Sequence, residues 1–307
     1  MKKKIIIDTD MGMDDIIAIS MLTSSQKIDV IGISTVFGLV KPEIGAANIS
    51  KIFGYCGIKK EICIGTDRAL RKNSWNDSFP KQDIRNSTRL DFLKRPVLNT
   101  DYKDTIVSDN VEDWIFQKVC KYPDKISILC LGPLSNTAKT LLKYGENFEN
   151  RITELVIMGG AISVPGNVPP IFSSEYNFFL DPNAASLILT SKIPIRLVSL
   201  DGAKQVPANS NSLKNILNKS PTNKSGKIIK EILINNRNDF KYFYDPLAAS
   251  ILINPLIASF SNGKSINVIQ SSKYKGKTII SDGKNKNVRI IKNVNSKSFY
   301  MLFKNVM

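Results

Sequence analysis

The first fifteen residues place four aspartates directly after a short β-branched strand. Ile5, Ile6 and Ile7 form an apolar run, and Asp8-Thr9-Asp10-Met11-Gly12-Met13-Asp14-Asp15 follows before the apolar stretch 16–22. An apolar run, a glycine-bearing turn and a second apolar segment predict strand, loop and helix. In an open α/β sheet such a loop lies at the carboxyl end of a strand, where ligands bind. Crowded carboxylates repel one another there, so the segment predicts a hard, oxygen-liganded cation, Ca²⁺ or Mg²⁺.

Strand-like and helix-like segments alternate along the rest of the chain. The pattern predicts strands at 28–37, 62–65, 126–131, 152–158 and 193–200, and helices at 42–55, 111–120, 208–240 and 298–306. Asp181-Pro182 and Asp245-Pro246 each predict a helix start with the aspartate as N-cap. Residues 266–291 alternate in the manner of antiparallel strands. We therefore expect one α/β domain over residues 1–307, with an open, mainly parallel, twisted sheet flanked by helices and a small antiparallel C-terminal part.

Residues 66–108 interrupt this regular pattern. They are polar and aperiodic, and they include Trp75 and Phe79. A long irregular insertion in a compact domain is usually functional or disordered. Two interpretations stay open, a lid over the site and a solvated insertion.

Composition excludes several classes of protein. No apolar run is long enough to span a bilayer, and the run at 5–7 is too short for a signal peptide, so we expect a cytoplasmic protein without a membrane partner. The four cysteines lack CxxC spacing and predict buried thiols. The net charge of +16 is spread along the chain without a nucleic-acid-binding signature, so no nucleic-acid partner is expected. The chain contains no histidine, which excludes histidine-based acid–base chemistry.

The ordered motifs of the chain resemble those of the nucleoside hydrolases, the inosine–uridine-preferring family. The opening Asp8–Asp15 segment is similar to the family's N-terminal signature. Later segments resemble its other motifs in their usual order: Thr35-Val36-Phe37-Gly38, Leu131-Gly132-Pro133-Leu134-Ser135-Asn136, Met158-Gly159-Gly160-Ala161, Gly166-Asn167, Glu175-Tyr176-Asn177 with Asp181-Pro182, and Asp245-Pro246. The resemblance covers nearly the whole chain.

This resemblance implies a Ca²⁺-dependent hydrolysis of the N-glycosidic bond of ribonucleosides. The implied metal ligands are the carboxylates of Asp10, Asp15 and Asp245 and the backbone carbonyl of Leu131. Asp10 would also be the catalytic general base toward water. The implied sugar-binding residues are Asp14, Met158, Asn167, Glu175 and Asn177. The family resemblance also implies a homodimer or homotetramer. Independently, glycosidic cleavage passes through an oxocarbenium-like sugar, which a carboxylate-rich site stabilises.

Two positions depart from the family pattern. Leu39 stands where family members often have Asn, or Asp in the purine-specific group, so a contact to sugar or base is lost or replaced. Tyr244 stands where many members have the histidine that protonates the leaving base. An aromatic residue there resembles the purine-specific subgroup, in which rings stack on the purine, and Trp75 would supply the opposing ring. A purine nucleosidase is therefore the favoured hypothesis.

Other functions stay open at this point. One is a pyrimidine-preferring or broad nucleoside hydrolase, and another is a non-catalytic nucleoside-binding relative. A third is a Mg²⁺-dependent phosphatase with Asp-x-Asp at a strand end, which Met11-Gly12 and the Asp14-Asp15 pair fit poorly.

Overall fold

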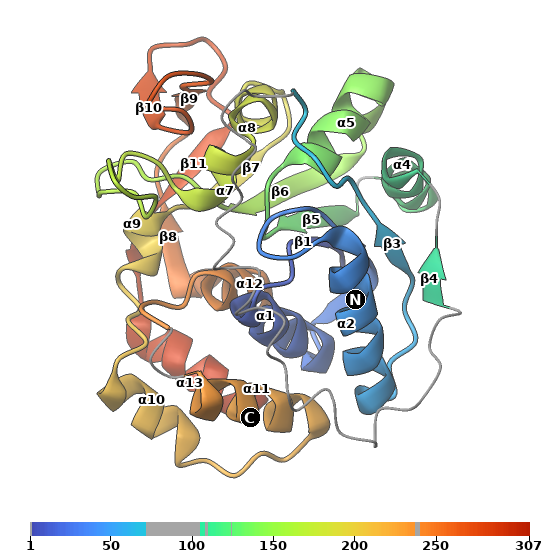
Figure 1. Ribbon diagram of the computed structural model, residues 1–307, viewed down its shortest axis with the longest axis vertical. Helices are drawn as coiled ribbons and strands as arrows, with labels where there is room; N and C mark the ends of the chain where they lie inside the picture. The colour runs from blue at the N-terminus through green and yellow to red at the C-terminus, as the bar shows by residue number, and fades with distance from the viewer. Residues whose placement is uncertain (1, 72–104, 108–109, 124, 237–239) are drawn as a thin grey trace.

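A twisted, mainly parallel sheet forms the centre of the molecule (Figure 1). The computed structural model describes residues 2–71, 105–107, 110–123, 125–236 and 240–307. Within these residues the main sheet has the order β4-β3-β2-β1-β5-β6-β7-β11-β8, and β10 and β9 form a separate antiparallel pair. The strands are β1 (Lys3–Thr9), β2 (Ile28–Thr35), β3 (Ile62–Ile64), β4 (Ile106–Val107), β5 (Ile126–Cys130), β6 (Ile152–Met158), β7 (Ile195–Val198), β8 (Ala258–Phe260), β9 (Ser265–Val268), β10 (Thr278–Ser281) and β11 (Val288–Val294).

Helices cover both faces of this sheet. They are α1 (Met13–Ser24), α2 (Pro42–Cys56), α4 (Val111–Lys121), α5 (Ser135–Tyr144), α6 (Glu146–Glu149), α7 (Tyr176–Leu180), α8 (Pro182–Leu189), α9 (Leu200–Ala203), α10 (Ser210–Leu217), α11 (Lys224–Asn235), α12 (Asp245–Ile253) and α13 (Ser296–Val306), with a 3₁₀ turn η4 (Pro255–Ile257). Helices α1, α2, α11, α12 and α13 pack on one face and α4, α5 and α8 on the other (Figure 1).

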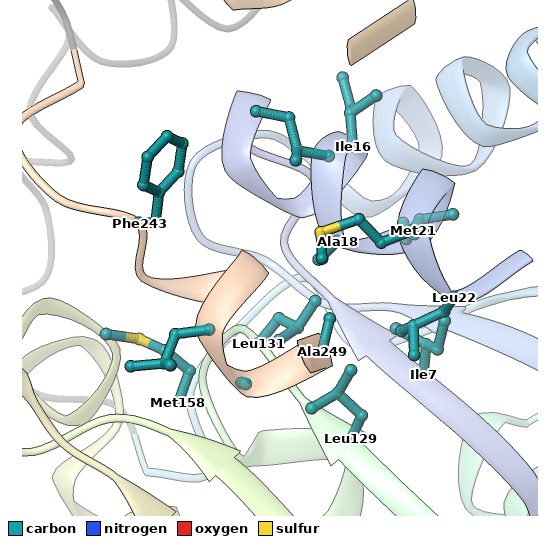
Figure 2. Packing of buried hydrophobic residues seen from close by; sticks show 14 of the residues in the cluster. Ile7, Ile16, Ala18, Met21, Leu22, Leu129, Leu131, Met158, Phe243 and Ala249 are labelled. Atoms are coloured by element: carbon teal, nitrogen blue, oxygen red, sulfur yellow. The ribbon is translucent and has the colours of Figure 1, made fainter. Parts of the chain in front are cut away.

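Strand β1 is buried on both faces, as expected for a central parallel strand. Ile5 and Ile7 belong to the core beneath α1 and α12, whereas Ile6 belongs to the core beneath α4 and α5. Figure 2 shows the first of these cores, in which Leu129 and Leu131 lie beside Ala249 of α12. The sequence alternates its isoleucines between two apolar layers because successive side chains of a strand point to opposite faces.

The strand order reverses at the centre of the sheet. From β1 the chain proceeds outward to β2 and β3 on one side, and it returns to place β5, β6 and β7 on the other side. Such a reversal leaves a crevice outside the carboxyl ends of the two central strands, where α/β proteins bind ligands. The segments after β1 and β5 are the predicted aspartate loop and Leu131, so the fold brings them together.

Most of the predicted elements are confirmed, and four details are wrong. The helical region 208–240 contains two helices, α10 and α11, separated by residues 218–223. In the tail, β9 and β10 are antiparallel as predicted, and β11 pairs antiparallel with β8, but β11 also joins the main sheet parallel to β7. Asp245 is the first residue of α12, whose N-cap is Tyr244, and its carboxylate joins the aspartate cluster described below. Cys120 is exposed and Cys56 half-buried, whereas Cys63 and Cys130 are the buried thiols predicted.

The proposed lid, with Trp75, lies mainly outside the described residues. Its first part, Thr66–Leu70, is described and is anchored to α5 and α8 by hydrogen bonds to Asn136 and Asp181. None of the helices in the described ranges is long and apolar enough to cross a membrane.

Candidate active site

A pocket of about 420 Å³ opens at the carboxyl ends of β1, β5 and β6. Its walls come from the aspartate loop, the loop after β2, the segment at the start of α7 and the start of α12. The lining residues are Asp10, Gly12, Met13, Asp14, Asp15, Leu39, Leu131, Met158, Asn167, Glu175, Tyr176, Asn177, Phe240, Tyr244 and Asp245. Every site residue predicted from the sequence lines this pocket, except Trp75, which lies outside the described residues.

The aspartate loop is folded by its own side chains. Thr9 Oγ1 donates to Asp15 Oδ1 and accepts from the Met11 backbone N–H at 3.0 Å. The Gly12 N–H donates to the other oxygen of Asp15, at 2.9 Å. Met11 has φ of +59°, a left-handed conformation that costs energy for a residue with a side chain. The loop reverses sharply at Met11, which lets α1 begin at Met13 and places Asp14 and Asp15 in its first turn.

Three carboxylates form a tight cluster across the pocket. One oxygen from each of Asp14, Asp15 and Asp245 lies within 4.8 Å of the others, and Asp15 and Asp245 are buried. Burial raises the pKa of all three carboxyls. The charge of Asp15 contributes further to the pKa of Asp14, which reaches about 7, and the charge of Asp14 contributes to that of Asp245. A cation bound among these oxygens would offset both desolvation and repulsion, so the donor set fits a hard divalent ion.

Asp10 lines the same pocket and is held by the loop after β2. Its Oδ2 accepts the Leu39 backbone N–H at 2.9 Å. Burial, followed by the charge of Asp15, raises its pKa well above the ordinary value. A Cβ on Gly38 would lie 2.1 Å from Asp10 Oδ2, so only glycine allows the loop to approach this closely.

Asp8 does not line this pocket, and its side chain bonds to residues of β2 and α5. Its Oδ1 accepts from Ser34 Oγ at 2.6 Å and from Asn136 Nδ2 at 2.8 Å, whereas Oδ2 is buried and has no hydrogen-bond partner among the described residues. Its backbone carbonyl accepts the Leu131 N–H at 2.8 Å. Asp8 therefore supports the ends of β1 and β5.

The pocket lining also contains a buried carboxylate and an amide, from Glu175 and Asn177. The buried Glu175 accepts from the backbone N–H groups of Gly160 and Asn177, at 3.0 and 2.8 Å. Asn177 Nδ2 donates to the Leu131 carbonyl at 2.7 Å, and the Leu131 side chain is in the core (Figure 2). Carboxylate and amide groups together can accept from and donate to hydroxyl groups.

Aromatic residues line the remaining wall. Tyr244, Phe240 and Tyr176 lie there, and Tyr242 packs edge-on to Tyr244 with ring centroids 6.1 Å apart. Burial, and then the charge of Asp14, raises the pKa of the Tyr244 hydroxyl above its ordinary value. Tyr244 is therefore a poor proton donor, and its ring is the part that can serve a ligand. Sequence reasoning missed Phe240 and Tyr176 as pocket residues, although their aromatic character next to Tyr244 and Glu175 was a usable signal.

The fold and pocket together define an α/β protein with an acidic small-molecule site at the switch point of its sheet. The model of the inosine-uridine preferring nucleoside hydrolases matches residues 5–301, and the chain belongs to this family.

Among its relatives, a rice protein described as probable uridine nucleosidase 2 is 27% identical over 85% of this chain and 77% of its own length. The pyrimidine-specific ribonucleoside hydrolase of Escherichia coli is 31% identical over 66% of this chain and 61% of its own. The chain spans 60% to 77% of the length of the first four curated relatives.

Solved structures of nucleoside hydrolases resemble this chain over its whole fold. A plant nucleoside hydrolase has a TM-score of 0.81 at 25% identity, covering 100% of this chain and 99% of its own. The purine-preferring ribonucleoside hydrolase of Gardnerella vaginalis has a TM-score of 0.80 at 25% identity, and the match covers 99% of this chain and 98% of its own.

Proposed function

We propose that this chain hydrolyses the N-glycosidic bond of ribonucleosides with the help of a bound Ca²⁺ ion, and that it prefers purine nucleosides. The observation that supports this function most is the make-up of the pocket lining. It contains both carboxylates whose oxygens gather within 4.8 Å, those of Asp14, Asp15 and Asp245, and the hydrogen-bonding side chains of Glu175 and Asn177. Such a lining suits a ribose held with its anomeric carbon near an activated water.

The tasks of the side chains then differ, and Asp10 has two of them. Asp15, Asp245, Asp10 and the Leu131 carbonyl would hold the ion. When bound, a divalent ion lowers the pKa of a nearby water molecule and neutralises the crowded carboxylates. Asp10 also takes the proton of the attacking water while the oxygen of that water bonds to the anomeric carbon.

The bond to the base nitrogen breaks as the water attacks, and the base leaves with the bonding electrons. Asp14, Asn167, Glu175 and Asn177 would bind the sugar hydroxyls, with Met158 against the ring. The leaving base takes its proton from solvent, because the chain has no histidine and the pKa of Tyr244 is raised.

Purine preference is supported by the aromatic wall. Tyr244 and Phe240 offer ring surface, and stacking is stronger for the larger purine. Uridine preference is the second candidate, because several relatives are described as uridine nucleosidases. The predicted homodimer or homotetramer and the cytoplasmic location stay predictions.

The test is release of free base from inosine, guanosine, adenosine, uridine and cytidine, each with Ca²⁺ or with excess chelator. We expect turnover with Ca²⁺ alone, a higher kcat/KM for inosine than for uridine, and loss of turnover but not of nucleoside binding in Asp10→Asn. A wild-type protein that binds nucleosides without releasing base would favour the non-catalytic alternative. Phosphate release from a phospho-sugar without base release would favour the phosphatase.

A further inference from the structure

We propose that Asn136 is a positioning residue for Asp10, acting through the loop after β2. This inference rests on the proposed function, in which Asp10 is the general base. Asn136 lies in the first turn of α5, and its side chain is fully buried. It does not line the pocket, so its effect on the reaction has to pass through other residues.

The amide of Asn136 joins three segments that end at the site. Its Nδ2 donates to Asp8 Oδ1 at 2.8 Å and to the Thr35 carbonyl at 2.9 Å. Its Oδ1 accepts the Thr66 backbone N–H at 2.9 Å. The side chain thereby connects β1, the end of β2 and the segment that follows β3, and all three contacts are buried charge-assisted or backbone hydrogen bonds.

From Thr66 the connection continues to Asp10 through the main chain. The Thr66 carbonyl accepts the Phe37 N–H at 3.0 Å, and two residues later the Leu39 N–H donates to Asp10 Oδ2 at 2.9 Å. The Val40 N–H also donates to the Asp10 carbonyl, at 3.3 Å. The loop 36–40 is therefore fixed at one end to Thr66 and at the other to Asp10, so a shift of Thr66 moves the donor that orients the carboxylate.

Close packing at two glycines makes this connection stiff. A Cβ on Gly65 would lie 2.3 Å from Asn136 Nδ2 and 2.0 Å from the Thr35 carbonyl, and a Cβ on Gly38 would lie 2.1 Å from Asp10 Oδ2. Both ends of the connection thus lack the space to relax. A general base displaced by about 1 Å can cost about 100-fold in rate, so a small movement here is enough to matter.

The test compares Asn136→Ala with Ser34→Ala. Both variants remove a donor to the same oxygen of Asp8, but Ser34 Oγ has no hydrogen bond to the loop. At saturating Ca²⁺ we expect Asn136→Ala to lower kcat by about 10- to 100-fold with KM changed less than about threefold, because a misplaced base then acts mainly on the transition state. We expect Ser34→Ala to leave kcat within about threefold of wild type.

Gly65→Ala provides a second route to the same connection if Asn136→Ala does not fold, since its Cβ would push Thr66 away from Asn136. The same loss of kcat at constant KM is expected. An unchanged kcat in a folded variant, a change in KM alone, or an equal loss in Ser34→Ala would overturn the inference while the proposed function stands. Absence of base release by the wild-type protein would instead overturn the proposed function, and the inference with it.

Discussion

Replacing Asp245 by Asn should stabilise the fold when no Ca²⁺ is present, and most of this advantage should disappear when Ca²⁺ is bound. The oxygens of Asp14, Asp15 and Asp245 lie within 4.8 Å of one another, and at an effective dielectric constant of about 20 two charges at this distance repel by about 3.5 kcal/mol. Without a cation, Asp245→Asn removes such repulsion and should stabilise the fold by about 2–4 kcal/mol. With saturating Ca²⁺, wild type regains about 2.7 kcal/mol at 100 times Kd, and the variant, which lacks a ligand, regains less.

Calorimetry in chelator and in Ca²⁺ at pH 8 measures how much of the variant's advantage Ca²⁺ removes. For 307 residues the unfolding entropy is about 0.64 kcal/mol/K, so 3 kcal/mol corresponds to a rise in Tm of about 5 °C in chelator. Burial and repulsion raise the folded-state pKa of Asp245, so its ionisation destabilises the fold progressively as pH rises above the unfolded value near 4. The advantage of the variant should therefore disappear toward pH 4.

A matched control is Asp201→Asn. The Asp201 carboxylate accepts the Ile162 and Ser163 N–H groups at 3.0 and 2.7 Å, outside the cluster. This variant should be less stable than wild type in both buffers, because it loses charge-assisted hydrogen bonds. A lower Tm of Asp245→Asn than of wild type in chelator at pH 8 would refute the reasoning.

Three other outcomes are expected. Tyr244→Leu should raise KM for inosine about tenfold, because stacking on a base contributes about 1–3 kcal/mol. KM for uridine should change less, and equal changes for the two nucleosides would argue against stacking. Base release should decline as pH falls, because burial raises the pKa of Asp10, and a pH–rate profile flat down to about pH 4 would contradict its role as base. Glu154→Gln should lower Tm at pH 7. Burial alone would raise the pKa of Glu154, but its hydrogen bonds to Arg196 and Lys3, at 2.6 Å each, lower the pKa overall. The ionised Glu154 therefore stabilises the fold above about pH 4.5, and this stabilisation is lost as pH falls through the lowered pKa. A Tm difference that does not change between pH 7 and pH 3 would be inconsistent with that assignment.

Local patterns were enough to predict where the carboxylates of the opening segment lie. Asp14 and Asp15 follow a strand-and-turn signal by a few residues, so their place in the first turn of α1 depends on neighbouring residues only. The same is true of β6, predicted at its observed bounds from one apolar run. The parallel sheet with helices on both faces follows from the alternation of such segments, and the structure confirms it.

Features set by distant parts of the chain could not be predicted in this way. The alternation of β11 identifies a strand but not its neighbour, and burial against β7 and β8 decides that it joins the main sheet. Asp-Pro is a sound capping signal at Asp181, whose carboxylate accepts the Ala184 N–H. At Asp245 the same signal competes with the cluster, and only the packing of α12 beside α1 reveals which interaction dominates.

The structure also bears on how Asp10 and Asp14 divide their tasks. Asp14 belongs to the tight oxygen cluster with Asp15 and Asp245, although the family resemblance assigns it to the sugar and Asp10 to the ion. Asp10 is the carboxylate with a donor from another loop on one oxygen, the Leu39 N–H. A general base has to point in one direction throughout the reaction, and a hydrogen bond from a stiff loop supplies that constraint. A ligand of Ca²⁺ has looser requirements, because calcium accepts variable numbers and angles of oxygens. The fixed orientation of Asp10 therefore supports its assignment as the base. Because calcium tolerates variable ligands, Asp14 can contact either the ion or a sugar hydroxyl from the same position.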